Sequence, residues 1–199
     1  TFTASAGTAT ISDKNVATVN KTLTSLSGLT LVGGNNTMLA SNYNLGTGLP
    51  AAGSNNDVTI SQRALTLAAV TDSKTYDGST SSSGTVTVTN KASTDTVSAA
   101  QFFTSKDVAG AAQSTLQVNT GYTIVDGASA DMSSNYVVAT QTAAGTINKA
   151  NLSKVTAAKP YDGLSTVAAA QVTAIEGVNN ETFTASAGTA TISDKNVAT

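Results

Sequence analysis

The chain has 199 residues, of which 11% are charged, with a formal net charge of −2 and neither histidine nor cysteine. This composition lacks the basic patch of a nucleic-acid-binding protein and, without cysteine, excludes disulfides and thiolate metal sites. Without histidine or a paired-carboxylate arrangement, we expect no enzyme and no cofactor. No run of 18 apolar residues occurs, so we expect no membrane span.

Short stretches in which polar and apolar residues alternate predict strands along the whole chain. In chain order they are Asp57–Ile60, Ala64–Leu67, Gly84–Thr89, Thr115–Val118 and Tyr122–Val125. Turn-forming clusters such as Asp126–Ser129 separate them at about ten-residue spacing. The pattern predicts an all-β fold made of small β-sandwich modules.

Two segments depart from this pattern. Val167–Gly177 has helical propensity. The tripeptide Tyr-Asp-Gly precedes it at residues 161–163 and also occurs at residues 76–78, and the segment that follows the earlier copy alternates like a strand. We therefore predict a strand over Gln171–Ile175. Ser98–Phe103 has no clear counterpart elsewhere and is a candidate for a short helix.

Internal repeats organise the sequence. The segment TFTASAGTATISDKNVAT occupies residues 1–18 and again residues 182–199, which gives a period of 181 residues. Within that period the tripeptide Tyr-Asp-Gly occurs at residues 76–78 and 161–163, a spacing of 85. The sequence therefore predicts a tandem array in which two related modules alternate, of about 85 and about 96 residues.

The module borders are predicted from the lead-in to each Tyr-Asp-Gly, where a strand-like segment has a hinge in its middle. We place them near Arg63/Ala64 and Lys149/Ala150. Residues 1–63 would then be the C-terminal part of one module, 64–149 a complete module, and 150–199 the N-terminal part of the next. Neither end part should complete a module alone.

Five short motifs contain the candidate site residues, and each motif is predicted to be structural rather than catalytic or metal-binding. In the Tyr-Asp-Gly motifs we expect glycine to take a positive φ, aspartate to bind the turn backbone and tyrosine to pack on the module. An isolated aspartate is a poor Ca²⁺ site, because that ion takes six or more oxygens. The residues are Tyr76, Asp77, Gly78, Tyr161, Asp162 and Gly163.

The segment Asp13-Lys14-Asn15, copied near the C-terminus, is predicted to be an exposed turn. An isopeptide bond is the alternative, but it requires side chains from facing strands. A Ser-Asn-Tyr sequence occurs at the same relative place in both modules, and it contains the pairs Asn42-Tyr43 and Asn135-Tyr136. The few aromatic residues are expected to be core anchors.

Taken together, the Tyr-Asp-Gly lead-in, the Asp-Lys-Asn segment and the Asn-Tyr segment resemble the YDG- and MBG-type repeat domains of large bacterial surface adhesins, many of them similar to filamentous haemagglutinins of the two-partner secretion route. The resemblance implies Ig-like modules, with a β-grasp-like shape as the alternative. It also implies a stalk segment, secreted to the bacterial cell surface or extracellular matrix.

On this view the chain is a semi-rigid spacer in cell adhesion or a biofilm fibre, with neighbouring repeats and other copies as its partners. The alternative is a multivalent module with a weak glycan-binding, cell-surface-binding or self-associating site in each repeat.

Overall fold

The computed structural model describes residues 2–33, 40–44, 48–51, 53 and 55–197. Their regular elements are strands and short 3-10 helices, with no α-helix among them. The 3-10 helices are η1 (Ala40–Asn42), η2 (Ser133–Asn135), η3 (Ala169–Gln171) and η4 (Val178–Asn180). The all-β class predicted from the sequence is confirmed, and the described residues offer no helix of the kind that a β-grasp fold packs on its sheet.

The chain divides into two compact units. The first contains Thr1–Thr66, Val88–Ser98 and Thr123–Ala139, and the second contains Leu67–Thr87, Ala99–Tyr122 and Thr140–Thr199. The border predicted at Arg63/Ala64 falls inside the first unit, and that at Lys149/Ala150 falls inside the second. Both borders stay predictions.

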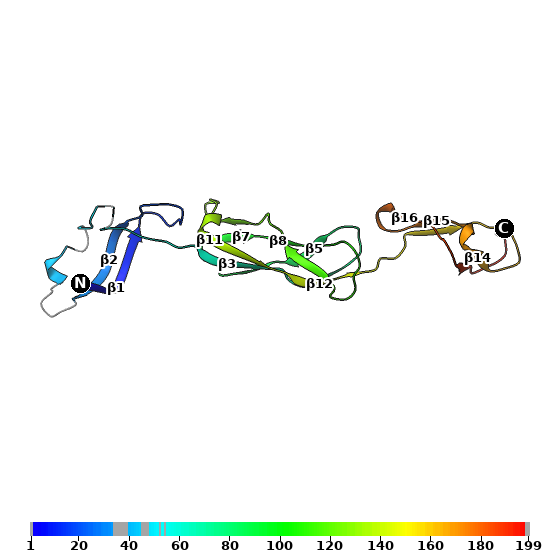
Figure 1. Cartoon of the computed structure of the whole chain (residues 1–199), viewed down its shortest axis with the longest axis horizontal. Helices are drawn as coiled ribbons and strands as arrows, with labels where there is room; N and C mark the ends of the chain where they lie inside the picture. Colours follow the sequence, from blue (N-terminus) through cyan, green and yellow to red (C-terminus); the bar gives the residue numbers. More distant parts are fainter. Residues whose placement is uncertain (1, 34–39, 45–47, 52, 54, 198–199) are drawn as a thin grey trace. The chain divides into compact units, whose positions relative to one another are not determined.

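A long antiparallel ribbon forms the beginning of the first unit, where β1 (Phe2–Ile11) pairs with β2 (Leu23–Gly33) (Figure 1). Its register is interrupted by irregularities, one of them beside Gly7. Gly7 has φ +102°, and a Cβ there would lie 2.5 Å from the backbone nitrogen of Leu29. Only glycine allows the two strands to approach so closely.

Two further sheets follow in the chain. β7 (Thr96–Ser98) pairs antiparallel with β10 (Thr123–Val125). β3 (Arg63–Ala68) lies between β11 (Tyr136–Gln141) and β6 (Thr87–Thr89). Leu65 and Leu67, two residues apart on β3, are fully buried, as expected for a strand with one covered face.

The main sheet of the second unit has five strands in the order β4-β12-β9-β8-β5. They are β4 (Asp72–Thr75), β5 (Ser81–Thr85), β8 (Ala100–Phe103), β9 (Ser114–Val118) and β12 (Ala143–Asn148). β4 and β12 run parallel, and the other pairs are antiparallel. The parallel pair is extended by two backbone bonds, Ala69 N to Gln141 O and Tyr76 N to Asn148 O.

One face of this sheet forms the core. Burial along β9 alternates residue by residue, as expected for a strand with one covered face. Phe103, Leu116, Val118 and Ile147 supply the buried side chains. Gly145 lies beneath them, because a Cβ at that position would come within 2.6 Å of the Phe103 ring and 2.9 Å of Leu116 Cδ1.

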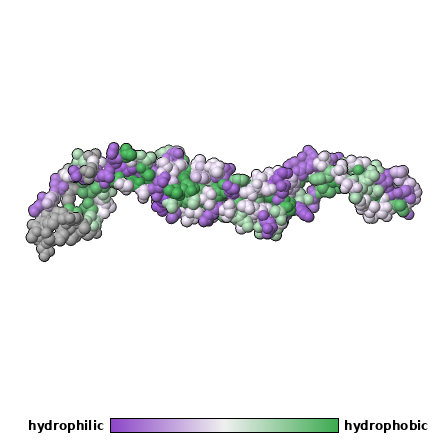
Figure 2. Space-filling model, viewed as in Figure 1, coloured by the Kyte–Doolittle hydropathy of each residue, from purple (hydrophilic) through white to green (hydrophobic). Residues whose placement is uncertain are grey.

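Residues 150–197 form two small sheets without a comparable core. β15 (Val172–Glu176) lies between β13 (Lys154–Ala157) and β16 (Thr182–Phe183), and β14 (Thr166–Ala168) pairs with β17 (Thr189–Thr191) (Figure 1). Val167 is buried, whereas Leu152, Val155 and Phe183 are each at least half exposed. In the space-filling view, hydrophobic residues reach the surface in several places among hydrophilic ones (Figure 2).

Most of the strands predicted from alternation are confirmed, as β3, β9 and β10, and so is the strand predicted at Gln171–Ile175 from the other module, as β15. The strand predicted at Asp57–Ile60 is wrong, because only Val58 forms an isolated bridge, to Lys21. The helix considered for Ser98–Phe103 is also wrong. β7 ends at Ser98 and β8 follows, with Gln101 and Phe103 buried on one face at a period of two.

The strand predicted at Gly84–Thr89 is divided. β5 ends at Thr85 and β6 begins at Thr87. Val86 between them is 6% exposed and marks the point where the chain leaves the five-stranded sheet and joins the sheet of β3. Alternation in the sequence continues across this point, so it gives no sign of the change of sheet.

Candidate inter-module contact sites

The first Tyr-Asp-Gly motif forms a tight turn after β4. Gly78 has φ +76°, and Asp77 Oδ1 accepts hydrogen bonds from the backbone nitrogen and the hydroxyl of Ser79, both at 2.9 Å. Lys74 Nζ lies 2.7 Å from the same carboxylate oxygen. The hydrogen bond from Lys74, followed by those from Ser79, lowers the pKa of Asp77 from 3.8 to about 2.

The second motif repeats this geometry. Gly163 has φ +77°, Asp162 Oδ1 accepts from the backbone nitrogen of Leu164 at 3.0 Å, and Lys159 Nζ lies 2.7 Å away. The pKa of Asp162 is lowered, first by Lys159 and then by the Leu164 amide. The aspartate in each motif is therefore occupied by its own turn and by the lysine three residues earlier.

The two tyrosines differ. Tyr76 donates its hydroxyl hydrogen to Glu181 Oε1 at 2.6 Å, and Lys106 Nζ donates to the Tyr76 oxygen at 3.1 Å. Lys106 also lies over the Tyr76 ring, 5.4 Å from its centre, and 3.8 Å from Glu181. The hydrogen bond with Tyr76 is the main reason why the pKa of Lys106 is raised. Tyr161 is 63% exposed, and its packing on a module stays a prediction, because residues 150–199 are only the first part of a predicted module.

A second contact joins the same two parts of the chain. Asn179 Nδ2 donates to the backbone oxygen of Asp77 at 2.8 Å. A Cβ on Gly78 would lie 2.6 Å from that nitrogen. Asn179 has φ +53°, a left-handed conformation that asparagine tolerates better than most residues. The turn of residues 76–78 thus contacts residues 179–181 through backbone and side chain alike.

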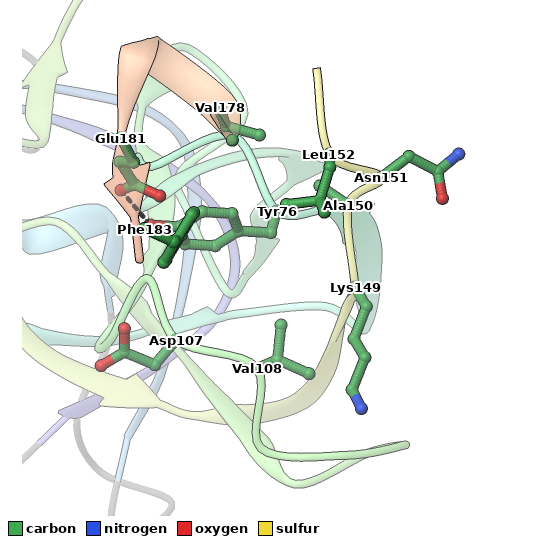
Figure 3. A pocket seen from close by; sticks show the side chains of 11 residues that line it. Tyr76, Asp107, Val108, Lys149, Ala150, Asn151, Leu152, Val178, Glu181 and Phe183 are labelled. Atoms are coloured by element: carbon green, nitrogen blue, oxygen red, sulfur yellow. Dashed lines mark hydrogen bonds between the residues drawn. The ribbon is translucent and has the colours of Figure 1, made fainter. Parts of the chain in front are cut away.

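An open hollow of about 360 Å³ lies beside this contact (Figure 3). Tyr76 and Glu181 stand on one side of it, Val108 on another, and the connecting residues Lys149–Leu152 along its edge. This connection follows β12 and crosses the border predicted at Lys149/Ala150. The cluster of Tyr76, Lys106, Asn179 and Glu181 is called the Tyr76 cluster below.

The Asp13-Lys14-Asn15 segment makes a corresponding contact in the first unit. Asp13 Oδ1 accepts from the Asn15 backbone nitrogen at 2.6 Å, which forms a local turn and is the main cause of the lowered Asp13 pKa. Lys14 Nζ lies 2.8 Å from Asp126 Oδ2. This pair raises the pKa of Lys14 and lowers that of Asp126.

Asn135 completes this contact. Its Oδ1 accepts from the Val16 backbone nitrogen at 2.7 Å, and its Nδ2 donates to Asn15 Oδ1 at 3.0 Å. We call Lys14, Asn15, Asp126 and Asn135 the Lys14 cluster. It joins a segment before the border predicted at Arg63/Ala64 to a segment after it.

The C-terminal copy shows which part of this contact is local. Asp194 Oδ1 accepts from the Asn196 backbone nitrogen at 2.9 Å, as Asp13 does from Asn15. Asn196 Nδ2 also donates a hydrogen bond to Asp194 Oδ1 at 2.9 Å. The turn is therefore formed by the sequence itself, whereas the side-chain contacts of the first copy depend on what lies next to it.

The Asn-Tyr pairs also differ in their surroundings. Tyr136 is 5% exposed, donates to Asp95 Oδ2 at 2.6 Å and accepts from the Ala92 backbone nitrogen at 2.9 Å. Burial, and next the bond to Asp95, raises the pKa of Tyr136. Asn42 is exposed at the end of η1, and Tyr43 is 61% exposed.

The contacts of the Tyr76 and Lys14 clusters join separate segments of the chain. Their hydrogen bonds and ion pairs join residues far apart in sequence, and no group of three or more metal-ligating side chains occurs in the described part of the chain. Among the same residues, no helix has the length and apolar character needed to cross a membrane.

Sequence reasoning missed the partners in both clusters. Glu181 lies 105 residues from Tyr76, and Asp126 lies 112 residues from Lys14. Lys106 belongs to a Ser-Lys-Asp segment that parallels Ser12-Asp13-Lys14, and this parallel was the one available signal. Nothing local marks Asn179 or Glu181 as contact residues.

Comparison with known families agrees with the motif. Residues 61–143 match the family model of the YDG domain. The match covers the first Tyr-Asp-Gly turn, β3 to β11 and the Asn135-Tyr136 pair. No curated protein and no solved structure matches the chain.

Proposed function

We propose that this chain is a structural spacer segment of a tandem-repeat protein at the bacterial cell surface or in an extracellular fibre, in which successive YDG-type modules hold one another in a fixed orientation. The observation that carries the proposal is the Tyr76 cluster. The connection between β12 and β13 has only five residues, Lys149–Ser153. Hydrogen bonds of the Tyr76 cluster join residues before this connection to residues after it. A freely jointed linker would have no such bonds.

The Lys14 cluster supports the same role at the other border. Lys14 and Asn15 bind Asp126 and Asn135, and Gln62, next to the border, donates to the backbone oxygens of Ser134 and Tyr136. At each predicted border, several hydrogen bonds or ion pairs thus join residues before the border to residues after it. Fastened borders restrict bending, and this restriction is what a spacer needs in order to hold a binding tip away from a surface.

The test measures how the radius of gyration depends on the number of repeats. Arrays of one, two and three 181-residue repeats are compared by small-angle X-ray scattering. A semi-rigid spacer gives a radius of gyration that rises almost in proportion to repeat number, whereas a flexible chain rises about as the square root. A square-root dependence would overturn the proposal.

A variant and its control test whether the Tyr76 cluster makes the array stiff. Tyr76→Phe together with Lys106→Ala removes the bonds to Glu181, and we expect the rise per repeat to fall. Tyr122→Phe is the control, because Tyr122 is half-buried in the complete predicted module and lies outside the Tyr76 cluster. Equal effects of both changes would show that the cluster does not stiffen the array.

The alternative is a multivalent binder with a weak glycan site in each repeat. One observation favours it: the hollow beside Tyr76 is bordered by the rings of Tyr76 and Phe183 and by the carboxylates of Asp107 and Glu181. Aromatic rings with nearby polar groups suit sugar faces and hydroxyls. A glycan array on the 199-residue chain distinguishes the two, since specific binding that Phe183→Ala abolishes would establish the alternative.

A further inference from the structure

The five-stranded sheet has two edge strands, β4 and β5. Within the described residues, β4 pairs only with β12 and β5 pairs only with β8. All five strands lie inside the complete predicted module, so these edges belong to the module itself. Backbone amides and carbonyls on an open edge can pair with a strand of another molecule. In this sheet, side chains bind many of those backbone groups.

Asp72 of β4 binds amides of β5. Its Oδ2 accepts hydrogen bonds from the backbone nitrogens of Ser83 at 2.8 Å and Gly84 at 3.2 Å. It also accepts from the Ser82 hydroxyl at 2.5 Å, and this bond is the main reason why the pKa of Asp72 is lowered. The carboxylate thus takes the place that a backbone carbonyl of a paired strand would take.

Lys74, two residues further along β4, binds the carbonyls. Its Nζ donates to the backbone oxygens of Ser79 at 2.8 Å and Ser81 at 3.2 Å, which are five and seven residues ahead of it. In the second Tyr-Asp-Gly motif, Lys159 donates to the backbone oxygens of the residues at the same two distances ahead. Because both motifs share this arrangement, it belongs to the geometry of the motif.

Gln101 of β8 binds the backbone at the start of β4. Its side chain accepts from the Val70 nitrogen at 2.7 Å and donates to the Val70 oxygen at 2.9 Å. Nε2 also donates to the Ser82 hydroxyl at 2.9 Å. Gln101 is buried, and glycine at position 84 leaves room for it, because a Cβ there would clash with Nε2. We call Asp72, Lys74 and Gln101 the β4–β5 seam.

We propose that the β4–β5 seam keeps these two strands from pairing with the same strands of a second copy of the chain. The seam binds two amides and two carbonyls of the β5 side, the groups that strand addition at a sheet edge requires. A second copy is the partner with matching edges, because each copy carries both strands. β5 (Ser81–Thr85) contains no charged residue, so the charges that protect this edge come from the seam. The inference concerns self-association and does not depend on the spacer role.

The first test compares single substitutions in the full chain by size exclusion with light scattering. Asp72→Ala releases the amides of β5, and Lys74→Met releases the carbonyls while it keeps an unbranched apolar side chain. We expect multiples of the 19.7 kDa chain mass in both variants, at a concentration at least about tenfold below that of any association of the parent. The two substitutions move the net charge in opposite directions, so a shared result cannot come from net charge.

Asp131→Ala and Lys91→Met are the matched controls. Asp131 accepts from the backbone nitrogen and the hydroxyl of Ser133, and Lys91 donates to the backbone oxygen of Asp95. Neither residue lies on the five-stranded sheet, so both controls should stay monomeric. If the controls associate as readily as the seam variants, general destabilisation explains the association and the proposal is wrong.

Circular dichroism during urea denaturation identifies the variants that fold. Asp72→Ala and Lys74→Met release different groups of the same edge, so either one tests the proposal if the other fails to fold. A folded seam variant that remains a single chain at every concentration at which the parent does would overturn the proposal.

Amide hydrogen exchange locates the contact. In associated Asp72→Ala, the amides of Ser83 and Gly84 should exchange slowly, and at least about tenfold faster after dilution, because the partner strand replaces the lost carboxylate. In the parent, the exchange of these two amides should not depend on concentration. Association that leaves both amides in fast exchange at every concentration would place the contact elsewhere and contradict the proposal.

Discussion

Single residues in this chain act mainly by ending, turning or fastening strands. Asp77 and Asp162 each bind a backbone amide two residues ahead, and Gly78 and Gly163 allow the positive φ of the turn. Buried polar residues fasten segments: Gln101 donates to the Val70 carbonyl and accepts from the Val70 amide. Each of these roles depends on a few hydrogen bonds, and each can be removed by one substitution.

Removing the Tyr136 hydroxyl should destabilise the chain. Tyr136→Phe leaves the buried carboxylate of Asp95 and the Ala92 amide each without this partner. The expected loss of unfolding free energy is about 1–3 kcal/mol, measured by urea denaturation at pH 7. Tyr122→Phe is the control, because Tyr122 is only half-buried and its expected effect is under about 0.5 kcal/mol. Equal effects of the two variants would contradict the importance of the buried bond.

Acid should weaken the fold between about pH 4 and pH 2. The pKa of Asp77 is lowered to about 2, below its ordinary value of 3.8, so the folded state binds fewer protons than the unfolded state in this range. The stabilisation is therefore complete above pH 3.8 and is lost as pH falls through 2. Thermal unfolding from pH 6 to pH 2 measures it, and Asp77→Asn should flatten the decline. An unchanged slope in that variant would assign the acid sensitivity to other carboxylates.

At the scale of elements, the fold depends on strands that lie close together. Gly145 of β12 lies directly under Phe103 and Leu116. β12 is also the strand that joins β4 to β9, so a shift of its backbone affects both neighbours.

We expect Gly145→Ala to destabilise the chain by about 1–3 kcal/mol, because the added methyl overpacks the core. Gly127→Ala is the matched control, since a Cβ there meets nothing within 4 Å. Chemical denaturation of both variants against the parent measures the difference. If Gly145→Ala were as stable as Gly127→Ala, the side chains above β12 would be able to move aside for the methyl group, and the prediction would be wrong.

The strands and local turns could be predicted from the sequence, because alternation and Asp-Gly dipeptides act over a few residues. Ser98–Phe103, a candidate for a short helix, contains β8 instead, and its period of two covers too few residues to be recognised in the sequence. The long-range contacts could not be predicted. Tyr76 and Tyr161 stand in the same motif, and only the arrangement of the chain gives Tyr76 a partner in Glu181.

For the whole molecule, hydrogen bonds, ion pairs and buried apolar side chains hold the described residues together. The chain contains no cysteine, and the described residues contain no metal-ligating cluster. The lysines that bind Asp77, Asp126 and Asp162 occupy the carboxylates that a cation would need.

Accordingly, calcium and EDTA should leave the thermal unfolding midpoint unchanged. Scanning calorimetry with Ca²⁺ or EDTA at a concentration on the order of millimolar measures the midpoint. A ligand that binds only the folded state would raise it. A shift of several degrees with Ca²⁺ would contradict this prediction.

The parallel pair β4-β12 has a mechanical consequence. Residues 69–76 run alongside residues 141–148 in the same direction, near the start and near the end of the predicted module. Tension on the two ends of that module pulls β4 backward and β12 forward, so the bonds between them are loaded together in shear rather than opened one after another. A chain under flow or traction would therefore resist extension at this pair until several bonds fail at once.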